Sequence, residues 1–142
     1  MNLYLGGFRG TDQGLGGSLN PWAVGGGKWR IYLKTSELNN PGPSTIFVFL
    51  DMREDSIDVG NFATQMSGWP ENPTKFGFYD LPGSYHHFAC GFSFADGHSE
   101  IHRWRDKRTM PPLVSGGLIY DQFPSPNNQD VGWLQEHTTR PK

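Results

Sequence analysis

The sequence predicts a small α+β domain built on an antiparallel sheet, with abundant loops and few short helices. Three observations support this fold class. Residues 86–104 hold two runs of alternating residue character on either side of Asp96-Gly97. The segment 46–50, IFVFL, is β-branched and aromatic, as buried strands are. The 19 glycines and 11 prolines among 142 residues leave little room for long helices.

The hairpin is the strongest of these signals. Its first run places aromatic residues and Cys90 on one face of a strand and small residues on the other. Asp-Gly is a frequent hairpin turn because glycine adopts positive φ without steric cost. We therefore expect strands at 90–95 and 99–104, joined at Asp96-Gly97, to form the centre of the fold.

The remaining elements are predicted to be short. Residues 46–50, bounded by Pro43 and Asp51, are expected to form a buried strand. We also expect a strand-like run at 29–33, a helical turn at 35–38, a short helix at 61–66, a surface loop at 68–84 and irregular chain beyond Asp106.

The length fits one domain over residues 1–142. Within it, 1–28 are expected to be a Gly-rich loop region, 29–139 the core and 140–142 a tail. The ten Phe, five Trp and five Tyr residues can build a small core, since each buried ring removes roughly 150–250 Å² from water.

Charge and hydropathy exclude several classes of protein. A net charge of −2 disfavours nucleic acid as a partner. The longest apolar run, 46–50, is far shorter than a membrane span, and the first residues lack the basic and apolar regions of a signal peptide. The single Cys90 allows no internal disulfide and is expected to be a core thiol. A soluble chain is expected.

One pattern resembles a known family. His86, nine further residues and then Asp96-Gly97 resemble the H-X9-DG signature of prepilin-type, pseudopilin-like proteins, which are abundant in Verrucomicrobia- and Planctomycetes-like bacteria. Other phrases are similar to the same family and cover most of residues 29–139: WRIYLKTSEL, NNPGPSTIFVFLD, DSIDVGNF, GFSFADGHSEIHRW, DKRTMPP and NNQDVGWLQEHTT.

The resemblance implies a function. Such proteins are similar to the major pseudopilin of type II secretion, in which a long N-terminal helix precedes a small antiparallel sheet. The chain would then be the head of a structural subunit of a type II secretion or type IV pilus-like assembly, and not an enzyme. Its partners would be other pilin-like subunits, its location extracytoplasmic, and its only membrane contact an N-terminal helix that these residues do not include.

The resemblance also implies a calcium site. FADG at 94–97 and DVGW at 130–133 are similar to stretches of the pseudopilin calcium-binding loop. The expected ligands are therefore the carboxylates of Asp96 and Asp130, completed by backbone carbonyls, because calcium takes 6–8 oxygen ligands. In this chain the strand HSEIHRW and a long insertion replace the Gly-rich spacer of that loop.

A metal-dependent hydrolase of esters or lactones is the alternative. His98, Glu100 and His102 share one face of the second hairpin strand if that strand is regular. Imidazoles with a carboxylate could hold zinc or copper and activate a water. A solvated strand face is the competing interpretation. The candidate residues are His86, His87, Asp96, His98, Glu100 and His102.

Two further groups of residues each allow a functional and a structural interpretation. The acidic run containing Asp51, Asp55 and Asp58 is either a second cation site or a solvated turn that caps a helix. The tryptophans offer a second alternative function, a carbohydrate-binding module, in competition with packing in a small core. They are Trp22, Trp69, Trp104 and Trp133.

Overall fold

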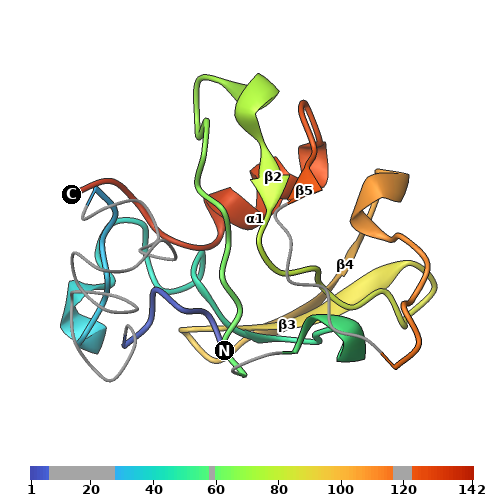
Figure 1. The fold of residues 1–142 in the computed structure, drawn as a ribbon. Helices are drawn as coiled ribbons and strands as arrows, with labels where there is room; N and C mark the ends of the chain where they lie inside the picture. The colour runs from blue at the N-terminus through green and yellow to red at the C-terminus, as the bar shows by residue number, and fades with distance from the viewer. Residues whose placement is uncertain (7–27, 58–59, 117–122) are drawn as a thin grey trace.

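The fold centres on a three-stranded antiparallel sheet, seen in a computed structural model that describes residues 1–6, 28–57, 60–116 and 123–142. Its strands are β1 (Phe47–Leu50), β3 (Ala89–Phe94) and β4 (Ser99–Arg103), in the order β1-β3-β4 (Figure 1). A second, two-stranded sheet pairs β2 (Gly77–Phe78) with β5 (Phe123–Pro124). The predicted α+β class with small antiparallel sheets is confirmed.

Helical structure is short. The α-helix α1 spans Gln129–Glu136. The 3-10 helices are η3 (Thr35–Glu37), η4 (Glu54–Ser56), η5 (Pro73–Lys75) and η6 (Lys107–Thr109).

The predicted hairpin and the predicted buried strand are confirmed. β3 and β4 pair in register from Ala89 opposite Arg103 to Ser93 opposite Ser99. Gly97 has φ +95° at the turn, a conformation that glycine adopts without strain. β1 pairs with β3 on the other side and places Phe47 in the core.

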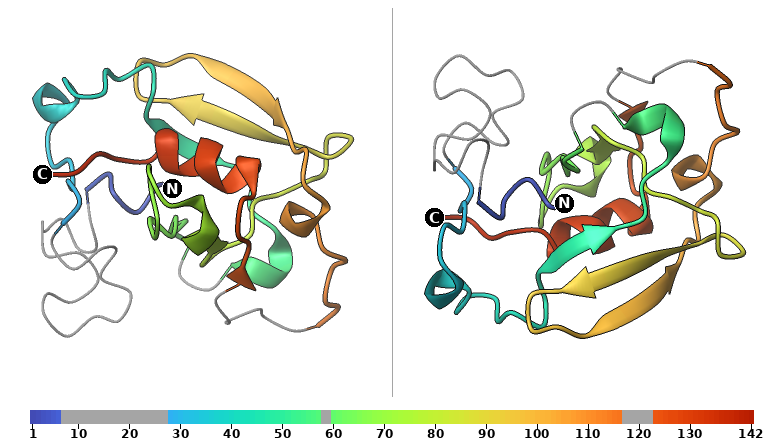
Figure 2. Two further views of the ribbon diagram at one scale, coloured as in Figure 1. Left: turned by 90° about the horizontal axis from the view of Figure 1, so that it is seen from above. Right: turned by 90° about the horizontal axis from the view of Figure 1, so that it is seen from below.

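Helix α1 covers one face of this sheet and closes an aromatic core (Figures 1 and 2). Phe92 is at its centre, with its ring centroid 4.9 Å from that of Trp133 on α1 and 5.5 Å from that of Phe47 on β1. Trp104 packs at 6.0 Å from the same ring. These edge-to-face contacts give the core geometric specificity as well as buried area.

One expected element is wrong, and a second is present only as isolated bridges. Residues 61–66 are not helical: Phe62 makes a parallel bridge to Asn2, and the buried run from 62 to 66 has no other regular secondary structure. Residues 29–33 form isolated bridges, Tyr32 with Leu5 and Trp29 with Pro141, rather than a strand within a sheet. In both segments the backbone conformation depends on bridges to residues far away in the sequence, which local propensity does not reveal.

The segment 68–84 is more than a surface loop. It contains η5 and β2, and it buries Phe76, Phe78 and Leu81. The chain beyond Asp106, expected to be irregular, contains η6, β5 and α1.

Both ends of the chain take part in the fold. Asn2, Leu3 and Tyr4 are buried although they fall in the expected loop region, and the amide of Asn2 donates to the carbonyls of Phe47 and Thr138. In the expected tail, Lys142 N–H donates to the carbonyl of Lys28. Over the described residues, no helix has the length and apolar character needed to span a membrane.

Candidate functional site

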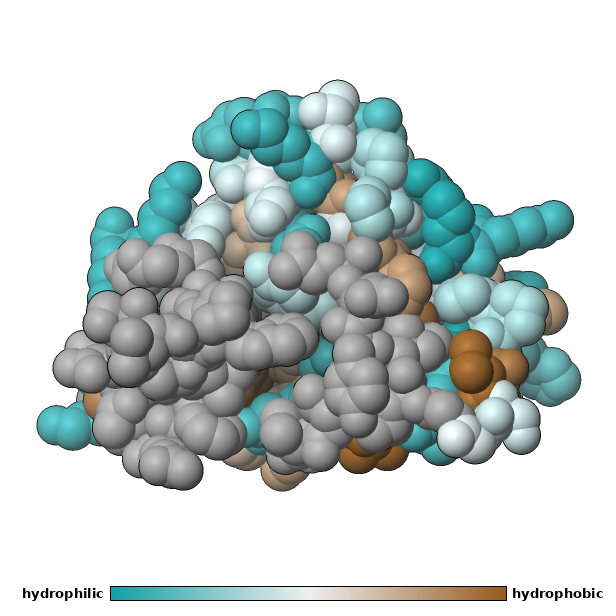
Figure 3. Space-filling model, in the orientation of Figure 1, coloured by the Kyte–Doolittle hydropathy of each residue, from teal (hydrophilic) through white to brown (hydrophobic). Residues whose placement is uncertain are grey.

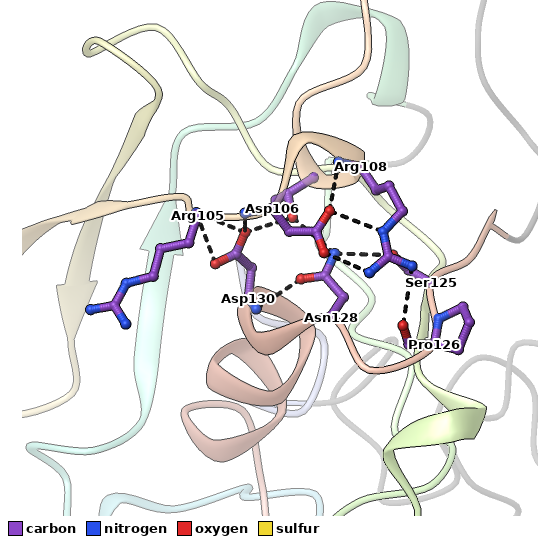
Figure 4. Close-up of polar contacts among 8 residues, drawn as sticks. Arg105, Asp106, Arg108, Ser125, Pro126, Asn128 and Asp130 are labelled. Carbon is purple, nitrogen blue, oxygen red and sulfur yellow. Dashed lines mark hydrogen bonds and ion pairs between the residues drawn. The ribbon is translucent and has the colours of Figure 1, made fainter.

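Asp130, one of the two expected calcium ligands, lies at the centre of a buried polar cluster (Figure 4). The backbone N–H of Arg105 donates to both of its carboxylate oxygens at 3.1 Å. The N–H of Asp106 donates to Oδ2 at 2.9 Å and the hydroxyl of Thr109 to the same oxygen at 2.8 Å. We call these contacts the Asp130 clasp. They join the start of α1 to the chain that leaves β4.

The helix start positions this carboxylate. Asn128 is the N-cap, and its side-chain oxygen accepts the N–H of Asp130 at 2.9 Å. The Asn128 amide donates to the hydroxyls of Thr109 and Ser125 at 3.1 and 3.0 Å. A carboxylate in the first turn of a helix is also stabilised by the helix dipole.

A surface ion pair extends the clasp outwards. Asp106 caps η6 by accepting the N–H of Arg108, and the two side chains form an ion pair at 2.6 Å. The Arg108 guanidinium also donates to the carbonyl of Pro126, which precedes α1 (Figure 4). Hydrogen bonds from Arg108 hold the pKa of Asp106 below its usual value.

Asp96, the other expected calcium ligand, lies at the hairpin turn. Its Oδ1 accepts the N–H of His98 at 3.1 Å and lies 2.6 Å from the His98 imidazole. These two contacts lower the pKa of Asp96. The clasp begins at Arg105, beyond the other end of β4, so about 20 Å of strand separates the two carboxylates at roughly 3.3 Å per residue.

The two carboxylates do not fit one calcium site. They lie at opposite ends of the hairpin, and the oxygens of Asp130 already accept N–H and O–H donors, which would have to be displaced. Within the described ranges, no three His, Cys, Asp or Glu residues come together in a group that could hold a metal ion.

The histidines also lie apart. His98 stacks on Phe94 at 4.3 Å near the hairpin turn. His102 stacks on Trp133 at 3.7 Å, and His137 stacks on Trp133 at 4.1 Å. Burial lowers the pKa of His102. His102 is therefore part of the packing between β4 and α1, while Glu100 is exposed and its charge acts on the His102 imidazole.

His86 pairs instead with Asp51. The imidazole Nε2 lies 3.1 Å from Oδ2 of Asp51, which also accepts the N–H of Gly91 at 3.0 Å. Both side chains of the pair are about half exposed. His87 is exposed, and it occupies the turn before β3 with a positive φ of 52°, followed by Phe88 at 67°.

A shallow hollow lies beside this pair on the face of the sheet opposite α1. It has a volume of about 580 Å³ and is lined by Asp51, Gly91 and Ser93, between the exposed side chains of Phe49 and Ile101. Asp51 and His86 together could orient a polar ligand or transfer a proton at the rim of this hollow.

Of the other acidic residues proposed as cation ligands, Asp55 forms an ion pair and Asp58 is outside the part of the chain that the structure describes. Asp55 is buried and bonded by the guanidinium of Arg53 at 2.8 and 2.6 Å. Arg53 also donates to the carbonyls of Pro111 and Pro112, so the pair is a structural contact. Asp58 lies outside the described residues.

The expected sugar-stacking tryptophans differ in exposure. Trp104 is buried and donates its indole N–H to the carbonyl of Gly83 at 2.8 Å. Trp133 is packed between imidazoles, and Trp69 is partly exposed against Trp29. Trp22 lies outside the described residues. Burial raises the pKa of Cys90 to about 12, as expected of a core thiol.

Comparison with known proteins finds no match for this chain. No protein-family model, curated protein or solved structure matches the chain. The case for a function therefore depends on the sequence phrases and on the geometry.

Sequence reasoning missed several residues that the geometry makes important. Thr109 and Asn128 complete the clasp, and Arg53 holds residues 111–112. Asn128 followed by an acidic residue at the second helical position was a detectable N-cap signal. Arg53 has one local partner, Asp55, but the carbonyls of residues 111–112 that it also binds, and the Asp130 partner of Thr109, are distant in the sequence.

Proposed function

We propose that this chain is the head of a pseudopilin-like structural subunit, which works outside the cytoplasmic membrane in a type II secretion or type IV pilus-like assembly. The observation that carries the proposal is the Asp130 clasp. It fastens the DVGW phrase to the chain that leaves the hairpin of the FADG phrase, and these are the two phrases that resemble the pseudopilin C-terminal region.

Side-chain packing also joins the C-terminal phrase to the hairpin. Trp133 of the C-terminal phrase contacts Phe92 and His102, one on each hairpin strand. In the pseudopilin resemblance, calcium would stabilise this region. Here the chain's own donors stabilise it, so the head can hold its C-terminal segment without a cation. The proposed partners are other pilin-like subunits, reached through an N-terminal helix outside these residues.

The DNA sequence directly upstream of the Met1 codon tests the proposal. We expect an open frame that encodes a basic leader, a prepilin peptidase site and an apolar helix. An upstream frame without an apolar segment, or a stop codon directly before a ribosome-binding site, would contradict it.

A hydrolase is the second candidate, favoured by the Asp51–His86 pair at the rim of the hollow. An imidazole oriented by a carboxylate can act as a general base. A panel of ester and lactone substrates, with and without chelator, tests this function. Turnover that His86→Ala abolishes, and that Leu33→Ala at another exposed position leaves intact, would establish the enzyme and overturn the structural proposal.

A further inference from the structure

The two edges of the main sheet differ. At β1, the N–H of Asn2 donates to the carbonyl of Val48 at 2.8 Å, and Phe47 N–H donates to the carbonyl of His137 at 3.0 Å. At β4, both views in Figure 2 show no other described segment along the outer edge. Within the part of the chain that the structure describes, one edge is therefore covered and the other is open.

The register shows which groups of β4 are unpaired. Phe94 N–H donates to the carbonyl of His98, and Trp104 N–H donates to that of Phe88. Even-numbered residues of β4 therefore bond to β3, and the backbone groups of Ser99, Ile101 and Arg103 point away from it. Among the described contacts these groups have no backbone partner.

The open edge has some of the devices that prevent edge pairing and lacks others. It is short and carries Glu100 and Arg103, but it contains no proline or lysine, and its register with β3 runs without a bulge. The side chain of Ile101, at its centre, is 69% exposed. Elsewhere, the coloured part of the face in Figure 3 is mainly hydrophilic, and its strongly hydrophobic residues lie in small separate spots rather than in one broad apolar patch.

We propose that two copies of this chain pair antiparallel along β4, with Ile101 opposite Ile101 of the second copy. This register places Ser99 opposite Arg103 and Glu100 opposite His102 across the two-fold axis. Three unpaired positions on each copy then exchange about six backbone hydrogen bonds. The two three-stranded sheets become one continuous sheet.

Charge and apolar contact favour this register. Moving the two-fold axis to Glu100 would oppose two carboxylates, which repel, and moving it to His102 would separate the two exposed isoleucines. Centring on Ile101 instead sets each carboxylate against an imidazole and brings the two exposed isoleucines together. The pairing involves only copies of this chain and is independent of the proposed function.

Cysteine cross-linking tests the register. Cys90 is the chain's only cysteine and is buried, so an introduced thiol reports its own position. In Ile101→Cys, the two Cα atoms of the dimer would be about 5.5 Å apart, within disulfide range. Ser99→Cys is the matched control on the same strand, because its two copies would be offset by about 13 Å along the strands. We expect oxidised dimer from Ile101→Cys at a yield about tenfold above that of Ser99→Cys.

Sedimentation equilibrium tests the association. The paired edge is short, so we expect the average mass to rise above that of the 15.9 kDa monomer only towards about 1 mM protein. Ile101→Lys places two like charges together and should weaken association at least about tenfold. Phe49→Lys, an equally simple change at an exposed residue of β1, should not. A monomer at about 1 mM, equal cross-linking of the two cysteine variants, or equal weakening by the two lysine variants would overturn the proposal.

Discussion

The carboxylate of Asp51 occupies the space that a side chain at Gly91 would fill. A Cβ built at Gly91 would lie 2.9 Å from Oδ2 of Asp51, closer than real Cβ contacts. The same oxygen accepts the N–H of Gly91 and contacts His86. Glycine at position 91 is therefore a condition for the Asp51–His86 pair.

Gly91→Ala should break this arrangement. The added methyl group must displace the carboxylate, which is the end of a half-exposed side chain and can move away, so we expect a loss of only about 0.5–1 kcal/mol. Urea unfolding should show that loss, and the NMR resonances of the His86 ring should move. Gly42→Ala is the control, since a Cβ there meets nothing within 4 Å. His86 ring resonances that stay unchanged in Gly91→Ala, as in Gly42→Ala, would show that Asp51 is not held as described.

Asp130→Asn should weaken the clasp. The variant keeps the shape of the side chain but turns an amide group towards N–H donors, and buried hydrogen bonds to a charged group contribute about 1.5–3 kcal/mol each. We expect a loss of about 2–4 kcal/mol in urea unfolding. Asp96→Asn, at the exposed turn, should lose much less. A larger loss of stability in Asp96→Asn than in Asp130→Asn would show that the Asp130 clasp does not hold α1 in place.

Acid should weaken the Arg53–Asp55 contact. Hydrogen bonds from Arg53 hold the pKa of Asp55 below its usual value. The unfolded chain therefore binds this proton at higher pH than the folded chain does, so the contribution to stability is present above about pH 5. It is lost as pH falls from about 4 through the lowered pKa.

The matched variant isolates that contribution. Asp55→Asn should cost about 3–5 kcal/mol at neutral pH, because it leaves a buried guanidinium unpaired. Its unfolding free energy should also fall less than that of the wild type between pH 6 and pH 3. Parallel pH profiles for the two proteins would show that Asp55 does not titrate in this way.

Calcium should leave the melting temperature unchanged. Asp96 and Asp130 lie apart, and the carboxylate oxygens of Asp130 already accept hydrogen bonds from protein donors. Thermal melts in calcium, in magnesium and in chelator should therefore coincide at matched ionic strength. Calcium at about 100 times its dissociation constant for such a site would add about 2.7 kcal/mol to the free energy of unfolding. A rise in melting temperature of about 5 °C or more in calcium alone would therefore show that the site exists.

Much of the sheet could be predicted from the sequence, because its signals are local. Period-two alternation and Asp96-Gly97 located the hairpin, and the run 46–50 located β1. Helix α1 was missed because it is short and contains Gly132, so its apolar positions are too few to show a helical period.

The candidate sites depended on contacts that no local pattern contains. Asp130 was predicted as a calcium ligand, but the donors that surround it come from residues 105–109, more than twenty positions earlier. The alternation that put His98 and His102 on one face did hold. That face packs against Phe94 and Trp133 rather than lying open to a metal.

The form of the protein in its own cells tests the central claim most directly. Antibodies against this chain can be applied to carbonate-washed membranes and to filaments sheared from the cell surface. We expect the antigen in both fractions, on a polypeptide longer than the 15.9 kDa of these 142 residues. A 15.9 kDa antigen confined to the soluble cytoplasmic fraction would contradict a pseudopilin-like structural subunit.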